Sequence, residues 1–218
     1  LLVLAPETFT SDIIVGQYDR SRTWRRFTGF LKDYPGVSML FGASSYDYIT
    51  SETAPSHTAR KVNDGLWVES HNSALMIDGE ANTEIFHKSR LVVAVEKTPY
   101  PAIFCRIDDL LGGVMGRCIG QDETTLLNIR SIDGKTIPVG SAVCYESVYG
   151  EYYTEYVRKG AKAMTIITND AWWGNTPGYR QHLSYASLRA IETRRAIARC
   201  ANTGISAIIS PSGKILQP

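Results

Sequence analysis

Short apolar runs separated by polar segments set the pattern of hydrophobic and polar positions along this chain. A strand that is buried on both faces is marked by a continuous apolar run, whereas a half-buried strand alternates. Continuous runs of strand length occupy Leu1–Ala5, Val37–Ser44 and Ala163–Thr168. We predict a buried strand at each of them. A final strand is predicted over Gly204–Ser210, before the turn Pro211-Ser212-Gly213-Lys214.

Two further pairs of strands are predicted to form hairpins, because an Asp-Gly turn separates the members of each pair. In the first pair, Asp78-Gly79-Glu80 joins Trp67–Ile77 to Thr83–His87. In the second pair, Asp133-Gly134 joins Thr125–Arg130 to Ile137–Tyr145.

Three segments carry helix signals. Thr23–Tyr34 precedes the helix breaker Pro35-Gly36, and Ser147–Lys159 begins with a suitable N-cap residue and ends at Gly160. The helical period is strongest over Gln181–Ala201, where the apolar positions are Leu183, Ala186, Ala190, Ile197 and Ala201. Cys200 is expected on this apolar face. A solvated, salt-bridged surface is expected for Arg189, Glu192, Arg194, Arg195 and Arg199.

Two segments show neither the hydrophobic pattern of a strand nor that of a helix. Residues 45–65 are rich in Ser, Thr, Asp and Gly and are predicted to be irregular, and residues 93–122 contain several Pro and Gly and are predicted to be a long loop. This loop is either disordered or an apolar lid or membrane-facing arm built on Leu110, Leu111, Val114 and Met115. The alternation of strands and helices predicts one α/β domain over residues 1–218, with helices layered on a buried sheet.

Composition excludes some classes of protein. The charges nearly cancel, with 23 basic and 22 acidic side chains, so bulk electrostatics does not favour a nucleic-acid partner. No apolar run approaches the roughly 20 residues that span a bilayer, and the chain begins without Met or a signal peptide. We expect a fragment of a longer protein.

The spacing of the four cysteines (Cys105, Cys118, Cys144 and Cys200) matches no zinc pattern.

Candidate chemistry lies where predicted strands end. Cys144 ends one strand and precedes a helix, whose dipole would favour a thiolate. Glu7 and Lys88 follow two other strands. A carboxylate can serve as general base, an ammonium can lower the thiol pKa and stabilise an oxyanion, and a thiolate can form a thioester. These three residues would suffice for acyl transfer without histidine, metal or cofactor.

Each of these residues also has an ordinary structural explanation. Glu7 could cap a helix or complete a turn, Lys88 could be a solvated surface lysine, and any of the cysteines could be a small buried apolar residue. The four histidines (His57, His71, His87 and His182) show no ligand spacing, and each is expected to be structural.

Three short motifs resemble the nitrilase, or carbon–nitrogen hydrolase, superfamily. They are Ala5-Pro6-Glu7, His87-Lys88-Ser89-Arg90-Leu91-Val92 and Val143-Cys144-Tyr145-Glu146, in the chain order of that superfamily's Glu–Lys–Cys triad. Within it, the apolipoprotein N-acyltransferase family is most similar. That similarity rests on Cys144-Tyr145-Glu146, Thr168–Gly174, Gln181-His182-Leu183, Arg189–Glu192 and Asn202–Ala207.

The resemblance implies an α-β-β-α sandwich with Glu7, Lys88 and Cys144 as the catalytic triad. It implies an acyltransferase that takes a fatty acyl chain from a phospholipid and passes it through a Cys thioester to the N-terminal amine of a diacylglyceryl-cysteine lipoprotein. It also implies a place in the bacterial inner membrane, through segments absent from this chain, with the catalytic domain on the periplasmic side. Glu96, Tyr145 and Glu146 would support the triad, although Tyr145 and Glu146 could merely pack and cap. Trp172 and Trp173 would line the acyl entrance or pack.

One loop departs from the family. Its members often carry Leu-Val-Pro-X-Gly-Glu after the lysine, whereas this chain has Leu91-Val92-Val93-Ala94-Val95-Glu96. Two rival interpretations stay open. The first is a soluble amidase or nitrilase of the same superfamily that hydrolyses a small amide or nitrile. The second is a catalytically silent domain that binds lipid or a lipoprotein, although the intact triad argues against it.

Overall fold

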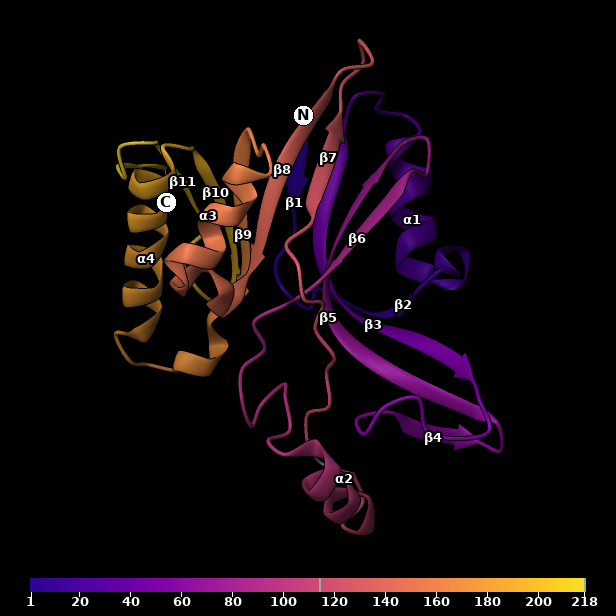
Figure 1. The fold of residues 1–218 in the computed structure, drawn as a ribbon. Coiled ribbons are helices and arrows are strands. Elements are labelled where there is room, and N and C mark those ends of the chain that lie inside the picture. Colours follow the sequence, from indigo (N-terminus) through magenta and orange to yellow (C-terminus); the bar gives the residue numbers. More distant parts are fainter. Residues whose placement is uncertain (114, 218) are drawn as a thin grey trace.

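The computed structural model describes residues 1–113 and 115–217, which form a pair of six-stranded sheets that face each other (Figure 1). The first sheet contains β1 (Leu2–Leu4), β2 (Thr10–Ile14), β3 (Ser38–Thr50), β4 (Arg60–Asn63), β5 (Leu66–Asp78) and β6 (Thr83–His87). The second contains β7 (Leu126–Arg130), β8 (Thr136–Val143), β9 (Ala163–Asn169), β10 (Ile197–Asn202), β11 (Ala207–Ile209) and β12 (Ile215–Gln217), in the order β12-β11-β10-β9-β8-β7.

Helices cover the outer faces of the two sheets. Figure 1 shows α1 (Arg22–Leu31) beside the first sheet, and α3 (Gly150–Arg158) and α4 (Gly178–Thr193) beside the second. A fourth helix, α2 (Pro101–Leu110), projects away from both sheets. Short 3₁₀ turns complete the fold: η1 (Tyr18–Arg20), η2 (Cys144–Val148) and η3 (Asp170–Trp173). The predicted α-β-β-α sandwich is confirmed.

Side chains that alternate along the strands divide the core into two layers. Leu40, Ala74 and Met76 belong to the core cluster that also contains Ala142 and Ile166 of the second sheet. Their neighbours on the opposite face form a second cluster with α1, which comprises Ala5, Ile13, Leu31, Phe41, Ala43, Leu75 and Ile77. The strands of the first sheet are therefore apolar on both faces.

The N-terminal segments differ somewhat from the prediction. β1 is a strand, but it lies beside β3 at the edge of the sheet, and Val3 is exposed. Residues 45–65 are less irregular than predicted, because β3 continues to Thr50 in unbroken antiparallel pairing with β5, and β4 lies within the same segment. Backbone hydrogen bonds along this ribbon do not require apolar side chains, so the composition did not reveal it.

The C-terminal segments differ more. The helix predicted over Gln181–Ala201 ends at Thr193, where Arg194 adopts a left-handed conformation (φ 52°), and the remainder forms β10 in parallel pairing with β9. Cys200 therefore lies on a strand. Arg189 and Arg199, expected on a solvated face, are both buried.

Two other expectations are corrected. The helix predicted to start at Ser147 begins at Gly150, because Ser147 lies within the 3₁₀ turn that follows Cys144. Residues 93–122 contain helix α2 and not only loop. Val114, named above as one residue of a lid, lies outside the described residues. Among the residues described, no helix is both long enough and apolar enough to cross a membrane.

Gly42 of β3 allows the segment that carries Glu7 to lie against the sheet. A Cβ at this position would come within 2.5 Å of Glu7 Cα and 2.7 Å of the Pro6 carbonyl oxygen. We expect Gly42→Ala to lower the free energy of unfolding by about 1–3 kcal/mol, as overpacking does. It should also displace Glu7. Urea denaturation measures the loss of stability.

Gly29 in α1 provides the control, because a Cβ there meets no atom within 4 Å. Gly29→Ala should raise the free energy of unfolding by up to about 1 kcal/mol, since alanine favours a helix. Equal stability of the two variants would contradict the close approach at Gly42.

Candidate active site

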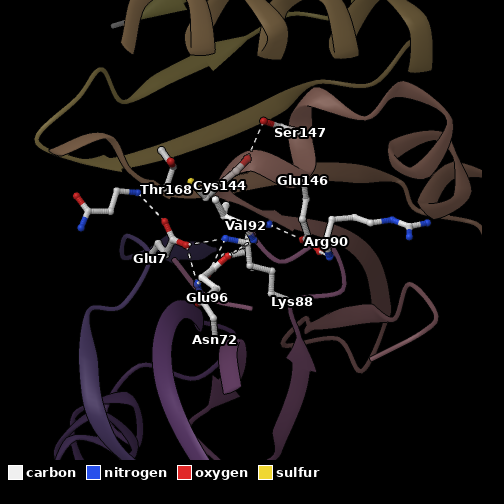
Figure 2. Close-up of polar contacts among 12 residues, drawn as sticks. Glu7, Asn72, Lys88, Arg90, Val92, Glu96, Cys144, Glu146, Ser147 and Thr168 are labelled. Atoms are coloured by element: carbon white, nitrogen blue, oxygen red, sulfur yellow. Dashed lines mark hydrogen bonds and ion pairs between the residues drawn. The ribbon is translucent and has the colours of Figure 1, made fainter. Parts of the chain in front are cut away.

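Glu7, Lys88 and Cys144 meet in one cavity of ≈ 420 Å³, at the ends of three strands from the two sheets. Glu7 follows β1, Lys88 follows β6, and Cys144 follows β8. Lys88 Nζ lies 3.2 Å from Glu7 Oε1 and 2.9 Å from Glu96 Oε1 (Figure 2). The structure thus brings together the three residues predicted to form the triad, and adds the predicted support Glu96.

Lys88 is a charged side chain held almost out of contact with water, with 1% of its surface exposed. Burial alone would lower its pKa. The negative charges of Glu7 and Glu96 outweigh that effect, so the pKa of Lys88 lies above its ordinary value. Lys88 therefore stays an ammonium, which is the form that can stabilise a developing oxyanion.

Asn72 of β5 holds both carboxylates, and sequence reasoning missed it. Its Nδ2 group donates to Glu7 Oε1 at 2.7 Å and to Glu96 Oε1 at 2.6 Å. The two N–H groups of one amide thereby fix two carboxylates around Lys88. The signal that could have found it is the polar run Glu69–Ser73 within the predicted strand Trp67–Ile77, because a polar run in a strand is unusual.

Glu96 reaches the site although its loop departs from the family pattern. Its Oε2 accepts the Val92 N–H at 2.8 Å, and its own N–H donates to the Val92 carbonyl at 2.9 Å. Ala94 takes a left-handed conformation (φ 69°) within this tight loop. The loop closes on itself through these bonds without the proline and glycine that relatives carry.

Glu7 has partners on its other carboxylate oxygen as well. Oε2 accepts the backbone N–H of Asn169 at 2.9 Å, at the end of β9. Its position therefore depends on both sheets, through Asn72 on one side and Asn169 on the other. Glu7 is 5% exposed and lines the same cavity as Cys144, where its negative charge acts on the thiol.

Cys144 sits at a sharp turn in a left-handed conformation (φ 54°). Such a conformation is costly for a residue other than glycine and persists where the surroundings impose it. Here the strand β8 ends one residue earlier, and the 3₁₀ turn η2 starts at Cys144 itself. The geometry is that of a nucleophile elbow, which presents the side chain at the edge of the sheet.

Glu146 ties the elbow to the lysine loop. It is fully buried, and its Oε1 accepts the N–H groups of Ser89 and Arg90 at 2.7 and 3.0 Å. Its Oε2 accepts the N–H of Val143 at 2.8 Å. Burial raises the pKa of Glu146 to about 7, against the lowering effect of these N–H groups. Glu146 thus links the residues after Lys88 to the residue before Cys144.

The thiol of Cys144 is not a resting thiolate, contrary to the expectation from helix dipole and lysine. Burial, followed by the negative charge of Glu7, raises its pKa to about 12, although Lys88 and a hydrogen bond with Thr168 act in the opposite direction. Acyl transfer by this thiol therefore needs a base that removes its proton, and Glu7, which lines the same cavity, is the predicted base.

Aromatic side chains surround the mouth of the cavity. Tyr145, Trp172 and Trp173 all line it, and Trp172 is 73% exposed. The exposed Val95 lies on the opposite loop and also lines the cavity. The two tryptophans predicted for an acyl entrance are thus at the cavity and are not packed in the core. Their role in binding stays a prediction.

The other cysteines have different surroundings. Cys105 is buried in α2, Cys200 is partly buried in β10, and Cys118 lines the cavity beside Glu96. Burial, followed by the charge of Glu96, raises the pKa of Cys118 to about 11. Among the described residues there is no group of His, Cys, Asp and Glu side chains suited to hold a metal ion.

One buried histidine lies directly behind the elbow, within the motif Gln181-His182-Leu183 that carries part of the family resemblance. His182 of α4 contacts Asp170 through Nδ1 at 2.9 Å, and its Nε2 lies 3.2 Å from the Cys144 carbonyl oxygen. The 3₁₀ turn η3, within the resembling segment Thr168–Gly174, supplies the Asp170 partner.

A comparison with protein families shows which class this fold and site belong to. The model of the carbon–nitrogen hydrolase family matches residues 49–218, so the chain belongs to that family of enzymes. In fold, the chain is similar to Nit3 of Saccharomyces cerevisiae, a nitrilase-superfamily member, with a TM-score of 0.65 and 16% identity over 99% of this chain and 70% of Nit3. It is likewise similar to an amidase from Nesterenkonia, with a TM-score of 0.60 and 16% identity over 99% of this chain and 71% of the amidase.

Sequence relatives point to one branch of the family. An apolipoprotein N-acyltransferase of Chlorobaculum tepidum is 34% identical over 69% of this chain and 29% of its own length. The enzyme of that name from Thermotoga maritima is 28% identical over 70% of this chain and 29% of its own length. The predicted resemblance to this group is confirmed. The chain spans less than a third of the length of these two curated relatives.

Replacement of Glu7 should change the rates of two reactions of Cys144 in opposite directions: alkylation should become faster and acyl transfer slower. Glu7→Gln removes the negative charge that helps to raise the pKa of Cys144, while Lys88 remains. The thiolate fraction at pH 8 should rise, so alkylation of Cys144 by iodoacetamide should become faster, by up to about ten-fold for each unit of pKa. Acyl transfer should fall by about 10²–10⁴-fold, since the general base is lost.

Alkylation is followed by mass spectrometry of the peptide that contains Cys144. Glu52→Gln, which changes an exposed carboxylate, serves as the control. Slower alkylation in Glu7→Gln would show that Glu7 does not hold the thiol protonated.

Proposed function

We propose that this chain is the catalytic domain of an apolipoprotein N-acyltransferase, with Glu7, Lys88 and Cys144 as its triad. The observation that carries the proposal is that Cys144 lines one cavity with the buried ion pair of Glu7 and Lys88, whose atoms Oε1 and Nζ lie 3.2 Å apart. This arrangement supplies base, nucleophile and oxyanion stabiliser within one cavity, with no metal or cofactor in the scheme. The catalytic domain would comprise residues 1–218.

The first half-reaction would form a thioester. Glu7 takes the proton from Cys144 as the sulfur attacks the ester carbonyl of a phospholipid. Lys88 and the backbone N–H of Tyr145 stabilise the tetrahedral oxyanion. The carbon–oxygen ester bond then breaks, and the protonated Glu7 gives its proton to the departing lysophospholipid.

The second half-reaction would form an amide. The neutral α-amino group of a diacylglyceryl-cysteine lipoprotein attacks the thioester carbonyl, and Glu7 accepts a proton from the nitrogen. The carbon–sulfur bond breaks, and Cys144 recovers its proton from Glu7. Glu96 and Asn72 would keep Lys88 and Glu7 in place through both steps, and Glu146 would hold the elbow.

Apolar surface near the site supports a lipid as acyl donor. Helix α2 leaves large apolar side chains in contact with solvent, with Leu110 87% exposed, and it projects from the sandwich (Figure 1). The other exposed apolar residues of α2 and its flanks are Tyr100, Ile103, Phe104, Ile107, Leu111 and Met115. Exposed apolar side chains gathered on one projecting helix form the kind of surface that a bilayer would cover.

The whole protein would act at the bacterial inner membrane, with this domain on the periplasmic side. Its partners would be a phospholipid donor and a diacylglyceryl-modified lipoprotein acceptor. The rival function, hydrolysis of a small amide or nitrile, uses the same triad with water in place of the amine. The similar folds of Nit3 and the amidase concern the architecture and do not favour it.

An acyl-enzyme on Cys144 is the expected intermediate. Incubation with phospholipid vesicles in the absence of acceptor should leave a fatty acyl adduct on Cys144, detected by mass spectrometry. Hydroxylamine should remove it, and Cys144→Ala should abolish it. Addition of a diacylglyceryl-cysteine peptide should discharge it into an N-acyl product, whereas a hydrolase would release free fatty acid.

Three further cysteines provide internal controls. Cys105→Ala, Cys118→Ala and Cys200→Ala should retain the adduct, because none of these thiols contacts Glu7 and Lys88 together. An adduct that persists in Cys144→Ala, or one that moves to another cysteine, would refute the proposal.

The role of α2 is tested separately. Ile103→Ser combined with Leu110→Ser should slow acylation from phospholipid vesicles by at least about ten-fold, since loss of even one aliphatic side chain from the lipid costs about 1.5–3 kcal/mol. Acylation by a short water-soluble ester should be unchanged, because the triad is intact. Val62→Ser, an exposed apolar position on β4, is the control. Equal losses with both donors would contradict a lipid-facing role.

A further inference from the structure

A buried polar cluster lies behind the nucleophile elbow, outside the cavity. It consists of Ser147, Asp170, His182 and Arg199, each at most 3% exposed. None of the four is among the described residues that line the cavity. Buried ionic groups lose their hydration and are a poor source of stability unless their geometry is well defined. The contacts of the cluster show what it holds in place.

The imidazole of His182 is fixed by its Nδ1 side. Nδ1 lies 2.9 Å from Asp170 Oδ1 and 3.3 Å from Arg199 Nη2, and Asp170 Oδ2 accepts from Arg199 Nη2 at 2.8 Å. Because Nε2 faces a carbonyl oxygen, only a ring with a proton on each nitrogen can donate to Asp170 and to that carbonyl together. The guanidinium of Arg199 also donates to the carbonyl of Ile205. Hydrogen bonds from His182 and Arg199 outweigh burial and hold the pKa of Asp170 below its ordinary value. Asp170 is thus a carboxylate that orients the ring.

The Nε2 side of the ring contacts the backbone of the elbow. His182 Nε2 lies 3.2 Å from the carbonyl oxygen of Cys144 and 3.1 Å from Ser147 Oγ. The hydroxyl of Ser147 donates to the same carbonyl oxygen at 2.9 Å. Two side chains therefore converge on one peptide group, the group that joins Cys144 to Tyr145.

Because the peptide group is rigid, fixing the carbonyl of Cys144 also fixes the direction of the Tyr145 N–H. The Cys144–Tyr145 peptide is trans, and in a planar trans peptide the C=O and N–H point in opposite directions. Figure 2 shows the Cys144 carbonyl pointing to Ser147, away from Glu7 and Lys88. The N–H of Tyr145 consequently points to the side on which Glu7 and Lys88 lie. Tyr145 is in the first turn of η2, where backbone N–H groups have no acceptor within the helix.

We infer that His182 is a positioning residue that sets the Tyr145 N–H as an oxyanion donor, by anchoring the carbonyl of the same peptide. The inference rests on the proposed role of Cys144 as an acyl carrier. Two physical effects contribute. The anchored carbonyl fixes the direction of the N–H, and hydrogen bonds to a carbonyl polarise the peptide so that its N–H donates more strongly.

The strained backbone of Cys144 makes such an anchor necessary. Its left-handed conformation (φ 54°) costs energy that neighbouring contacts must offset. Glu146 holds the N–H of Val143 before the elbow, and His182 with Ser147 holds the carbonyl after it. Without the second anchor, the Cys144–Tyr145 peptide is free to rotate and its N–H loses the direction that an oxyanion requires.

Substitution of His182 by Gln or by Asn tests the contacts of its two ring nitrogens one at a time. The amide nitrogen of Gln can occupy the place of Nε2 and keep the bond to the Cys144 carbonyl, whereas the shorter Asn reaches Asp170 but not the carbonyl. His182→Gln should therefore keep acyl transfer, and His182→Asn should lose it. His57→Asn, at an exposed histidine, is the matched control.

The experiment compares two reactions of the same sulfur. Acylation of Cys144 by a p-nitrophenyl ester passes through a tetrahedral oxyanion, but alkylation by iodoacetamide does not. Removal of a whole oxyanion donor costs about 10²–10³-fold in rate, so a misdirected donor should cost about 10–100-fold. We expect His182→Asn to slow acylation by this factor and to leave alkylation and the thermal midpoint of unfolding within about two-fold and a few degrees of the parent protein.

The outcomes separate a failure of the proposed function from a failure of the inference about His182. If the parent protein is not acylated at Cys144 by the ester, the proposed function fails. If the parent is acylated and His182→Asn is acylated equally fast, the inference about His182 is wrong. It is also wrong if acylation and alkylation fall together in His182→Asn, or if His182→Gln loses as much as His182→Asn, because His182 would then only maintain the elbow.

Discussion

The ammonium of Lys88, buried between two carboxylates, is the interaction on which the site depends. A lysine with 1% of its surface exposed cannot remain charged without nearby negative charge, so Glu7 and Glu96 must both lie within contact distance. Those carboxylates in turn need donors, and Asn72 supplies one to each. The loop of Glu96 and the segment of Glu7 are therefore fixed by the charge on one nitrogen.

The same charges explain why the thiol rests in its neutral form. Burial and the negative charge of Glu7 raise the pKa of Cys144 by more than the positive charge of Lys88 lowers it, so the thiol keeps its proton. A neutral thiol is safe from adventitious alkylation and oxidation, which act on thiolates. Lys88 favours the thiolate, because its positive charge lowers the pKa of Cys144. The proposed chemistry is thus consistent with a site that is unreactive at rest.

The sandwich places these groups by joining two sheets at the site. Glu7 and Lys88 follow strands of the first sheet and Cys144 follows a strand of the second, so no single sheet could assemble the three. Glu146 bridges the two halves through the backbone of Ser89, Arg90 and Val143. Packing between the sheets, through residues such as Leu40 and Ala142, accordingly sets the distance between Glu7 and Cys144.

The sequence by itself determined the strands that are apolar throughout, the hairpin of β5 and β6, and the residues Glu7, Lys88 and Cys144, because local composition and short motifs encode these features. It did not determine where α4 ends, since the period over 181–201 continued into residues that pair with β9 as β10. It also missed Asn72, gave no partner for His182, and placed Arg199 in solvent. Each of these is a polar side chain whose partner lies far away in the chain, such as Glu7 for Asn72 and Cys144 for His182. Only the tertiary structure decides such partners, because a buried hydrogen bond is specified by where two strands or helices end in space and not by the residues beside it.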